Sequence, residues 1–109
     1  MDIRFARPVH PGEMLREEFM IPLNLTPGKI ARALGVPRTR IERLVREETA
    51  LTVDTALRLA RYFCMSDGYW VKMQGLYDVN MLHNDAARQA EFDAITPLEG
   101  ADVAVGEAA

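Results

Sequence analysis

The chain has 109 residues, of which 49% are hydrophobic, so it is long enough for one domain with one packed core. No run of 18 apolar residues occurs and the N-terminus lacks a signal-peptide pattern, which argues against a membrane span and against secretion. The single cysteine excludes an internal disulfide and is typical of a protein in the reducing cytoplasm.

The net charge of −3 conceals an uneven distribution of charge along the chain. Residues 1–63 hold eleven Lys and Arg against eight Asp and Glu, a net of +3, whereas residues 64–109 hold two against eight, a net of −6. A basic half of this kind is compatible with a nucleic-acid ligand even though the whole chain is acidic.

The N-terminal residues 1–10 are predicted to form an extended arm, because Pro8 disfavours the α conformation in the residue before it. A first helix is predicted to begin at Pro11, with Glu13 in its first turn, where an acidic side chain suits the helix dipole. Its buried side is expected to consist of three apolar residues at helical spacing: Leu15, Phe19 and Leu23.

Residues 26–46 contain two short helical patterns joined by a turn at Gly35. Thr26 supplies an N-cap hydroxyl for the first of them, and Pro27 suits its first helical position. Gly35 can adopt the positive φ that ends a helix, Val36 can fill the crevice, and Pro37 can open the second helix. The expected buried stripes are Ile30, Ala31 and Leu34 in the first helix, and Ile41, Leu44 and Val45 in the second.

Two longer helices are predicted to follow. Thr52 caps the first of these, and its expected buried stripe consists of Val53, Ala56, Leu57, Ala60, Phe63 and Cys64, so that Cys64 is a packed thiol. Ser66 is expected to cap the second, in which four residues share one face: Trp70, Met73, Gln74 and Tyr77.

The pattern as a whole predicts an all-α, repressor-like domain of five to six helices that contains a helix-turn-helix. We expect the DNA-binding domain to span residues 11–79 and a C-terminal helix to span residues 80–96, ended by Pro97. Residues 97–109 are rich in Gly, Ala, Val and acidic residues without periodicity, which predicts a flexible acidic tail.

Four blocks of sequence resemble the HigA-type (VapI-like) antitoxins of the Cro/repressor helix-turn-helix superfamily, in order and in spacing. They are HPGEML at 10–15, LTPGKIARALGVPRTRI at 25–41, ALTVDTALRLARYF at 50–63 and YWVKMQGLYDV at 69–79. The resemblance covers about two-thirds of the chain. It implies a homodimer that binds double-stranded DNA at a pseudo-palindromic operator, neutralises a cognate HigB-like, mRNA-cleaving toxin and represses the operon that encodes the pair.

The chain departs from the family pattern at two places near the expected DNA surface. Pro27 stands where the family favours a glutamine that would hold a phosphate, and Glu47 and Glu48 stand where it favours glycine with basic neighbours. Two acidic residues beside the DNA surface would repel phosphates, so DNA affinity or target sequence should differ from those of relatives.

The second helix of the helix-turn-helix carries arginines at positions that its apolar stripe leaves free, which is how such a helix reads DNA. We expect Arg38, Thr39 and Arg43 to contact base edges, because arginine can grip guanine O6 and N7 together. Phosphate contacts are expected from Thr26, Lys29, Arg32, Arg40 and Arg46. The alternative is a solvated face in which Glu42 pairs with Arg38 or Arg46.

Nothing in the sequence points to catalysis, a cofactor or a metal. His10 and His83 lie far apart without other ligands at metal spacing, and no Gly-rich phosphate loop or acid/base pair with a nucleophile is recognisable. Two other functions stay open: a stand-alone helix-turn-helix regulator without a toxin, and a protein-interaction module whose DNA binding has decayed. Pro27, Glu47 and Glu48 favour decay, whereas the retained arginines argue against it.

Overall fold

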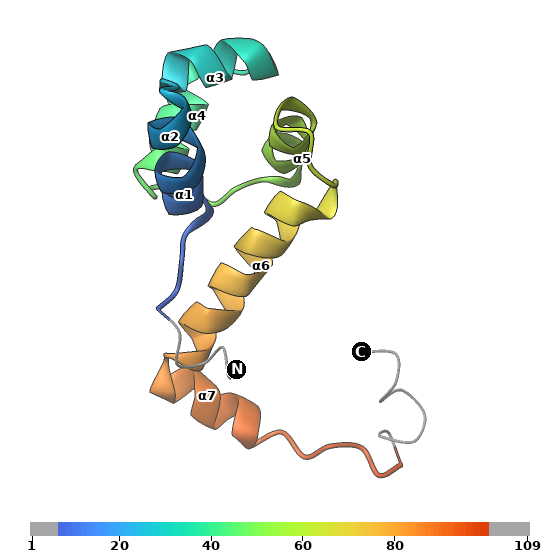
Figure 1. Cartoon of the computed structure of the whole chain (residues 1–109). Coiled ribbons are helices and arrows are strands. Elements are labelled where there is room, and N and C mark those ends of the chain that lie inside the picture. The colour runs from blue at the N-terminus through green and yellow to red at the C-terminus, as the bar shows by residue number, and fades with distance from the viewer. Residues whose placement is uncertain (1–6, 101–109) are drawn as a thin grey trace.

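The computed structural model describes residues 7–100, which form six helices and no strands (Figure 1). The first helix is continuous through three stretches, α1 (Pro11–Met14), the π-helical η2 (Leu15–Met20) and α2 (Ile21–Leu23). It is followed by α3 (Pro27–Leu34), α4 (Arg38–Val45), α5 (Val53–Tyr62), α6 (Gly68–His83) and α7 (Ala86–Asp93). The predicted all-α class is therefore confirmed, while residues 1–6 of the predicted arm and 101–109 of the predicted tail lie outside the described residues.

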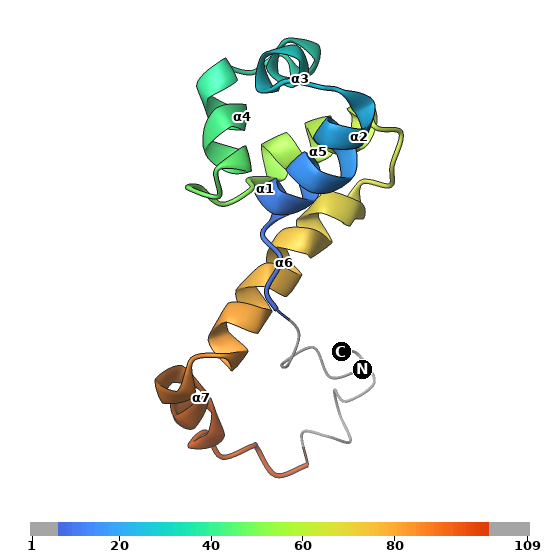
Figure 2. The same ribbon diagram turned by 60° about the vertical axis from the view of Figure 1, so that its left-hand side comes forward.

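The helices form a compact head and a projecting C-terminal stalk (Figures 1 and 2). Helices α1 to α5 surround the core together with the beginning of α6, and the rest of α6 leads away to α7 at the far end. The described chain measures 52 × 28 × 25 Å along its principal axes. Within residues 7–100, no helix is both long and apolar enough to cross a membrane.

Every residue of the segment His10–Glu13 has a local structural role at the start of α1. The imidazole Nδ1 of His10 accepts the N–H of Gly12 at 2.9 Å, and Pro11 at the first position has no N–H that needs a partner. The buried His10 ring also meets the ring of Tyr77 on α6 edge-on, with centroids 4.9 Å apart. The start of the first helix is thereby joined to α6.

Glu13 accepts two hydrogen bonds from the guanidinium of Arg7, at 2.8 and 2.6 Å, and these bonds lower the pKa of the Glu13 carboxyl. A lowered pKa in the folded state stabilises the fold above the unfolded pKa, and the gain is lost as pH falls through the folded value. Because 69% of the Arg7 side chain is exposed, we expect Glu13→Gln to lower the free energy of unfolding by less than about 1 kcal/mol at pH 7. In strong acid the substitution should leave the free energy of unfolding unchanged. Urea denaturation at several pH values measures this. Glu18→Gln is the control, since Glu18 has no ion pair within residues 7–100, and an equal pH dependence for both variants would contradict the prediction.

The π-helical stretch changes which side of the first helix is buried. The Ile21 N–H donates to the Arg16 carbonyl five residues earlier, so the helix is locally underwound. Leu15 is therefore followed on the buried side by Met20, five residues later. The expected stripe of Leu15, Phe19 and Leu23 is wrong at its end, because Leu23 is 57% exposed; Phe19 is half-buried against the rings of Phe63 and Trp70.

The core confirms the stripes expected for the helix-turn-helix. Ile30, Ala31, Leu34, Ile41 and Leu44 are buried, and Val45 is half-buried against them. Trp70 of α6 is completely buried and is the largest side chain of this core, with the rings of Phe19, Phe63 and Tyr69 around it. The other buried apolar residues are Leu15, Met20, Leu51, Ala56, Leu59 and Ala60.

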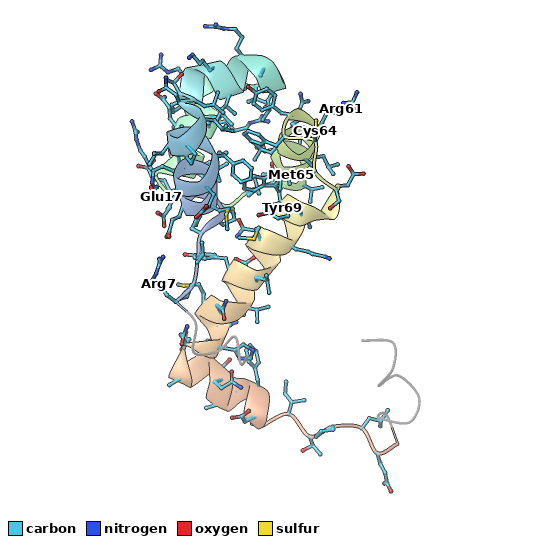
Figure 3. The ribbon with its side chains drawn as sticks, in the orientation of Figure 1. Arg7, Glu17, Arg61, Cys64, Met65 and Tyr69 are labelled. Carbon is cyan, nitrogen blue, oxygen red and sulfur yellow. The ribbon has the colours of Figure 1, made fainter. Side chains whose placement is uncertain are left out.

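The expected stripe of α5 is wrong at three positions. Val53 and Leu57 are 61% and 42% exposed and Cys64 is exposed, whereas Thr55 and Leu59 are buried instead. Both possible stripes contain Ala56 and Ala60, so the periodicity alone did not distinguish the two faces. Contacts with α3 and α6 decide the orientation of α5. In the resulting head, Glu17 of the first helix and Arg61 of α5 project from opposite sides (Figure 3).

Cys64 leaves the stripe because α5 ends there in a left-handed residue. Its φ is +56°, its N–H donates to the Arg61 carbonyl, and the Met65 N–H donates to the Ala60 carbonyl at 2.8 Å. A left-handed backbone is unfavourable for a residue with a Cβ, so we expect Cys64→Gly to raise the free energy of unfolding by up to about 1 kcal/mol. Cys64→Ala, which removes the thiol but keeps the Cβ, should show no such gain. Chemical denaturation that finds the two variants equally stable would contradict this explanation.

The C-terminal helices start and end at other residues than expected. The proposed Ser66 cap is wrong, because α6 begins at Gly68 after Asp67 and has no side-chain cap. The predicted shared face is confirmed, with Trp70 buried and Met73, Gln74 and Tyr77 half-buried. The single helix expected over residues 80–96 is also wrong: α6 runs on to His83, and α7 begins after Asp85, whose side chain accepts the Arg88 N–H and caps a new helix.

Candidate DNA-binding surface

Helices α3 and α4 form the predicted helix-turn-helix. The Thr26 hydroxyl caps α3 by accepting the Lys29 N–H at 3.2 Å. Gly35 ends α3 with a φ of +72°, and the next N–H, that of Val36, donates back to the Ala31 carbonyl at 3.0 Å. Pro37 is the N-cap residue of α4 and is itself extended, so α4 begins one residue later than expected.

The first helix holds α4 at its C-terminal end. A Cβ at Gly12 would lie 1.8 Å from the Leu44 carbonyl oxygen, so the two helices touch backbone to backbone there. The guanidinium of Arg16 donates to the Val45 carbonyl at 2.5 Å, which satisfies one of the last carbonyls of α4. These contacts fix the direction in which α4 presents its outer face.

That outer face carries the three predicted base readers. Arg38, Thr39 and Arg43 are all exposed, while Ile41 and Leu44 of the same helix point into the core. Thr39 and Arg43 line a hollow of about 590 Å³ between α4 and the start of α5, and the predicted phosphate ligand Arg40 lines it with them. Arg38 does not line this hollow. Its side chain instead runs past the start of α3, where a Cβ at Gly28 would lie 3.9 Å from the Arg38 Cδ.

Arg40 belongs to an ion-pair chain that connects α3, α4 and α5. Its Nη1 lies 3.1 Å from Asp54 Oδ2, and the same oxygen accepts from Arg58 Nε at 3.0 Å. Arg58 also donates to the Leu34 carbonyl at the end of α3, at 2.8 Å. The Arg40 head is therefore held at the edge of the hollow by one carboxylate that it shares with Arg58.

The sequence left open an alternative in which Glu42 pairs with Arg38 or with Arg46, and one of these two ion pairs is formed. Arg38 Nε lies 3.1 Å from Glu42 Oε2, whereas Glu42 and Arg46 do not pair within residues 7–100. Among the described residues, no ion pair involves four of the predicted DNA ligands: Lys29, Arg32, Arg43 and Arg46. These four side chains are all exposed, so α3, α4 and the residue after α4 carry cationic side chains in addition to the paired Arg38 and Arg40.

The two acidic residues after α4 differ in their surroundings. Glu47 adopts a φ of +63° at the end of the helix, where glycine is usual, and its carboxylate lies 3.4 Å from Arg16 Nη2. Glu48 has no ion pair within the described part of the chain, and its N–H donates to the Arg43 carbonyl at 3.0 Å. The charge of Glu47 is therefore partly balanced by Arg16, which reduces the repulsion of phosphates expected from the sequence.

The structure adds Thr49 and Thr52 to this surface, two residues that the sequence did not single out as DNA ligands. Both line the hollow opposite Thr39 and Arg43, and the Thr52 hydroxyl caps α5 by accepting the Thr55 N–H at 3.3 Å. The start of a ten-residue helix thus lies beside Arg40 and Arg43, and the Asp54 carboxylate in its first turn lines the same hollow. A capping threonine a few residues after the reading helix was the available signal. Within residues 7–100, no group of three or more His, Cys, Asp or Glu could hold a metal ion.

Comparisons with known proteins agree with this geometry. Residues 15–66 match the family model described as helix-turn-helix. The chain is 47% identical over 90 residues to virulence-associated protein I of Dichelobacter nodosus, covering 83% of this chain and 81% of that protein. It is 33% identical over 92 residues to antitoxin HigA-1 of Vibrio cholerae serotype O1, covering 84% and 85%. The solved structure of the Pseudomonas aeruginosa antitoxin HigA with the higBA promoter is 38% identical, with a TM-score of 0.75 over 84% of this chain and 99% of that one.

The fold and its exposed, arginine-bearing helix α4 are those of the DNA-binding helix-turn-helix class. Within that class, the chain belongs to the family of the HigA-type antitoxins and virulence-associated protein I. The resemblance seen in the sequence is thereby confirmed. The family consists of DNA-binding antitoxins and regulators, so the expectation that the chain is not an enzyme is also confirmed.

Proposed function

We propose that this chain is a homodimeric, sequence-specific DNA-binding antitoxin that represses the operon encoding it and its toxin. The observation that carries the proposal is the exposed outer face of α4, which bears Arg38, Thr39 and Arg43, with Thr39 and Arg43 beside the capped start of α5. Relatives of the same fold support it, since the Pseudomonas HigA structure contains the higBA promoter and another contains an operator of 18 base pairs.

The side chains divide into two kinds of DNA ligand. Arg38, Thr39 and Arg43 meet base edges in the major groove, where arginine discriminates guanine by two parallel hydrogen bonds. The phosphates on either side are held by Thr26, Lys29, Arg32, Arg40 and Arg46. The helix starts at Thr26 and Thr52 add backbone N–H groups, which compensate for the missing glutamine at Pro27.

The chain acts as a two-fold dimer on a pseudo-palindromic operator. Two recognition helices that enter successive major grooves on one side of the duplex lie about 34 Å apart, one helical turn of DNA. One α4 of eight residues reads only a few base pairs, so two copies are needed to select one site in a genome.

The second partner is a HigB-like toxin that cleaves mRNA, in the cytoplasm where both nucleic acids are found. An RNA-cleaving enzyme needs a basic surface to hold its substrate, and residues 64–109 of this chain have a net charge of −6. Opposite charges of this kind accelerate association and favour the correct partner.

Binding to the chain's own promoter tests the DNA half of the proposal. Gel shifts with the promoter fragment and with a scrambled duplex of equal length should show a clear preference for the promoter, and affinity should fall steeply between low and moderate salt. Equal affinity for both duplexes would favour a protein-interaction module whose DNA binding has decayed.

Co-expression with the neighbouring short gene tests the toxin half. The product of that gene should co-purify with this chain, and expression of the gene alone should arrest growth. If no neighbouring frame encodes a small basic protein while the promoter is still bound specifically, the chain is a stand-alone regulator.

A further inference from the structure

We propose that Glu42 is a positioning residue for DNA recognition, which holds the Arg38 guanidinium ready for a guanine; this inference rests on the DNA-binding function proposed above. Arg38 lies in the first turn of α4 and Glu42 one turn later on the same face. Their side chains meet through Arg38 Nε and Glu42 Oε2 at 3.1 Å. Only 26% of the Glu42 side chain is exposed, against 71% for Arg38, so the carboxylate is the anchored partner and the guanidinium the projecting one.

The atom that Arg38 uses for this bond matters for recognition. Nε is the inner nitrogen of the guanidinium, and the two terminal nitrogens make no hydrogen bond to residues 7–100. These terminal nitrogens are a pair of donors that can meet guanine O6 and N7 end-on. The bond to Glu42 therefore restrains the guanidinium without occupying the donors that a base requires.

The start of α3 lies near the same side chain. A Cβ at Gly28, at the start of α3, would lie 3.9 Å from the Arg38 Cδ and 4.0 Å from its Nε, which is ordinary van der Waals distance. Gly28 has no Cβ, so the start of α3 leaves room for the Arg38 stem beside the carboxylate on α4. An arginine held by a neighbouring carboxylate loses less rotamer freedom on binding DNA than an unrestrained one.

Arg40 provides a contrast on the same helix. It gives a terminal nitrogen, Nη1, to Asp54, and Asp54 also accepts from Arg58. A carboxylate on Nη1 leaves only one terminal nitrogen, Nη2, free, which is enough for a phosphate oxygen but not for a paired contact with guanine O6 and N7. Glu42 instead binds Nε and leaves both terminal nitrogens of Arg38 free. The pair of Glu42 with Arg38 therefore favours base recognition.

Glu42 has two effects on DNA binding that oppose each other and can be measured separately. Its negative charge repels phosphates, so its removal should strengthen binding to any duplex. Its bond to Arg38 holds the reading geometry, so its removal should weaken discrimination between the operator and other sequences. A residue that merely stabilises α4 would alter both affinities in the same direction and leave their ratio unchanged.

The test uses the full chain, the promoter fragment that it binds and a scrambled duplex of equal length, titrated at two salt concentrations. We expect Glu42→Ala to lower the ratio of promoter to scrambled affinity about tenfold while raising the affinity for the scrambled duplex. Glu42→Gln keeps an oxygen acceptor for Arg38 Nε and should retain most of the ratio. Glu48→Ala is the matched control, because it removes a neighbouring acidic side chain that has no ion pair within residues 7–100 and should leave the ratio unchanged.

The dependence on Arg38 is tested by combining the substitutions. In an Arg38→Ala background, Glu42→Ala should cause no further loss of discrimination. A continued loss there, or an unchanged ratio in the single Glu42→Ala variant with a wild-type thermal unfolding midpoint, would overturn the inference. A wild-type chain that does not prefer its promoter would instead refute the proposed function, and the inference with it, so the two failures are distinguishable.

Discussion

Replacing Gly12 by alanine is expected to lower the free energy of unfolding by about 3 kcal/mol, the upper end of the usual cost of overpacking. The added Cβ would lie 1.8 Å from the Leu44 carbonyl oxygen and 2.8 Å from its carbon, and neither atom can move independently of the backbone. The Leu44 carbonyl also accepts the Glu47 N–H at 2.9 Å, so its displacement would disturb the end of α4. Urea denaturation followed by circular dichroism measures the loss.

Gly75 in the middle of α6 provides the control for this substitution. A Cβ at Gly75 would meet nothing within 4 Å among the described residues, so Gly75→Ala should leave stability unchanged or raise it by up to about 1 kcal/mol through helix propensity. If Gly12→Ala were as stable as Gly75→Ala, the backbone contact between α1 and α4 would not exist in solution. A partly stable Gly12→Ala protein should also bind its promoter more weakly, because that contact holds α4 in place.

Arg38→Ala and Arg43→Ala are each expected to weaken promoter binding about 10- to 100-fold, as the loss of one arginine–guanine pair does. Both side chains are exposed on α4, and the core residues Ile41 and Leu44 lie on its other side, so the fold should tolerate the changes. Binding to a scrambled duplex should fall much less than binding to the promoter. Fluorescence anisotropy with both duplexes measures the difference.

Two other basic residues distinguish base reading from a general loss of charge. Arg46→Ala, at a predicted phosphate contact, should weaken binding to both duplexes by a similar factor and reduce the salt slope by about one. Arg88 lies on α7, at the far end of the C-terminal stalk (Figure 1). Arg88→Ala removes the same charge and should leave both affinities nearly unchanged. Equal losses for Arg43→Ala and Arg46→Ala on both duplexes would show that Arg43 holds a phosphate and does not read a base.

The sequence predicted only some of the left-handed residues that end the helices. Gly35 was expected to be left-handed and is, because glycine alone has no Cβ penalty in that conformation. Asn24, Glu47 and Cys64 end their helices in the same conformation, with φ values of +53°, +63° and +56°, and nothing in their side chains except that of Asn24 favours it. Backbone hydrogen bonds at the ends of α4 and α5 accompany this conformation at Glu47 and Cys64.

The sequence by itself determined the helix starts at Thr26 and Thr52, the turn at Gly35 and the buried stripes of α3 and α4. Each of these depends on residues within one or two turns of one another, so capping chemistry and helical period are enough to specify them. The sequence was also enough to identify the family, because the four matching blocks contain both the capping residues and their spacing.

Only the tertiary structure decided how those helices face one another. The face of α5 that is buried and the approach of Gly12 to Leu44 both depend on contacts between different helices. The ion pairs that qualify the arginine surface follow the same rule, since Asp54 and Arg16 come from neighbouring helices. Local pattern specifies a helix and its ends, whereas packing selects between faces of nearly equal hydrophobicity and brings distant charges together.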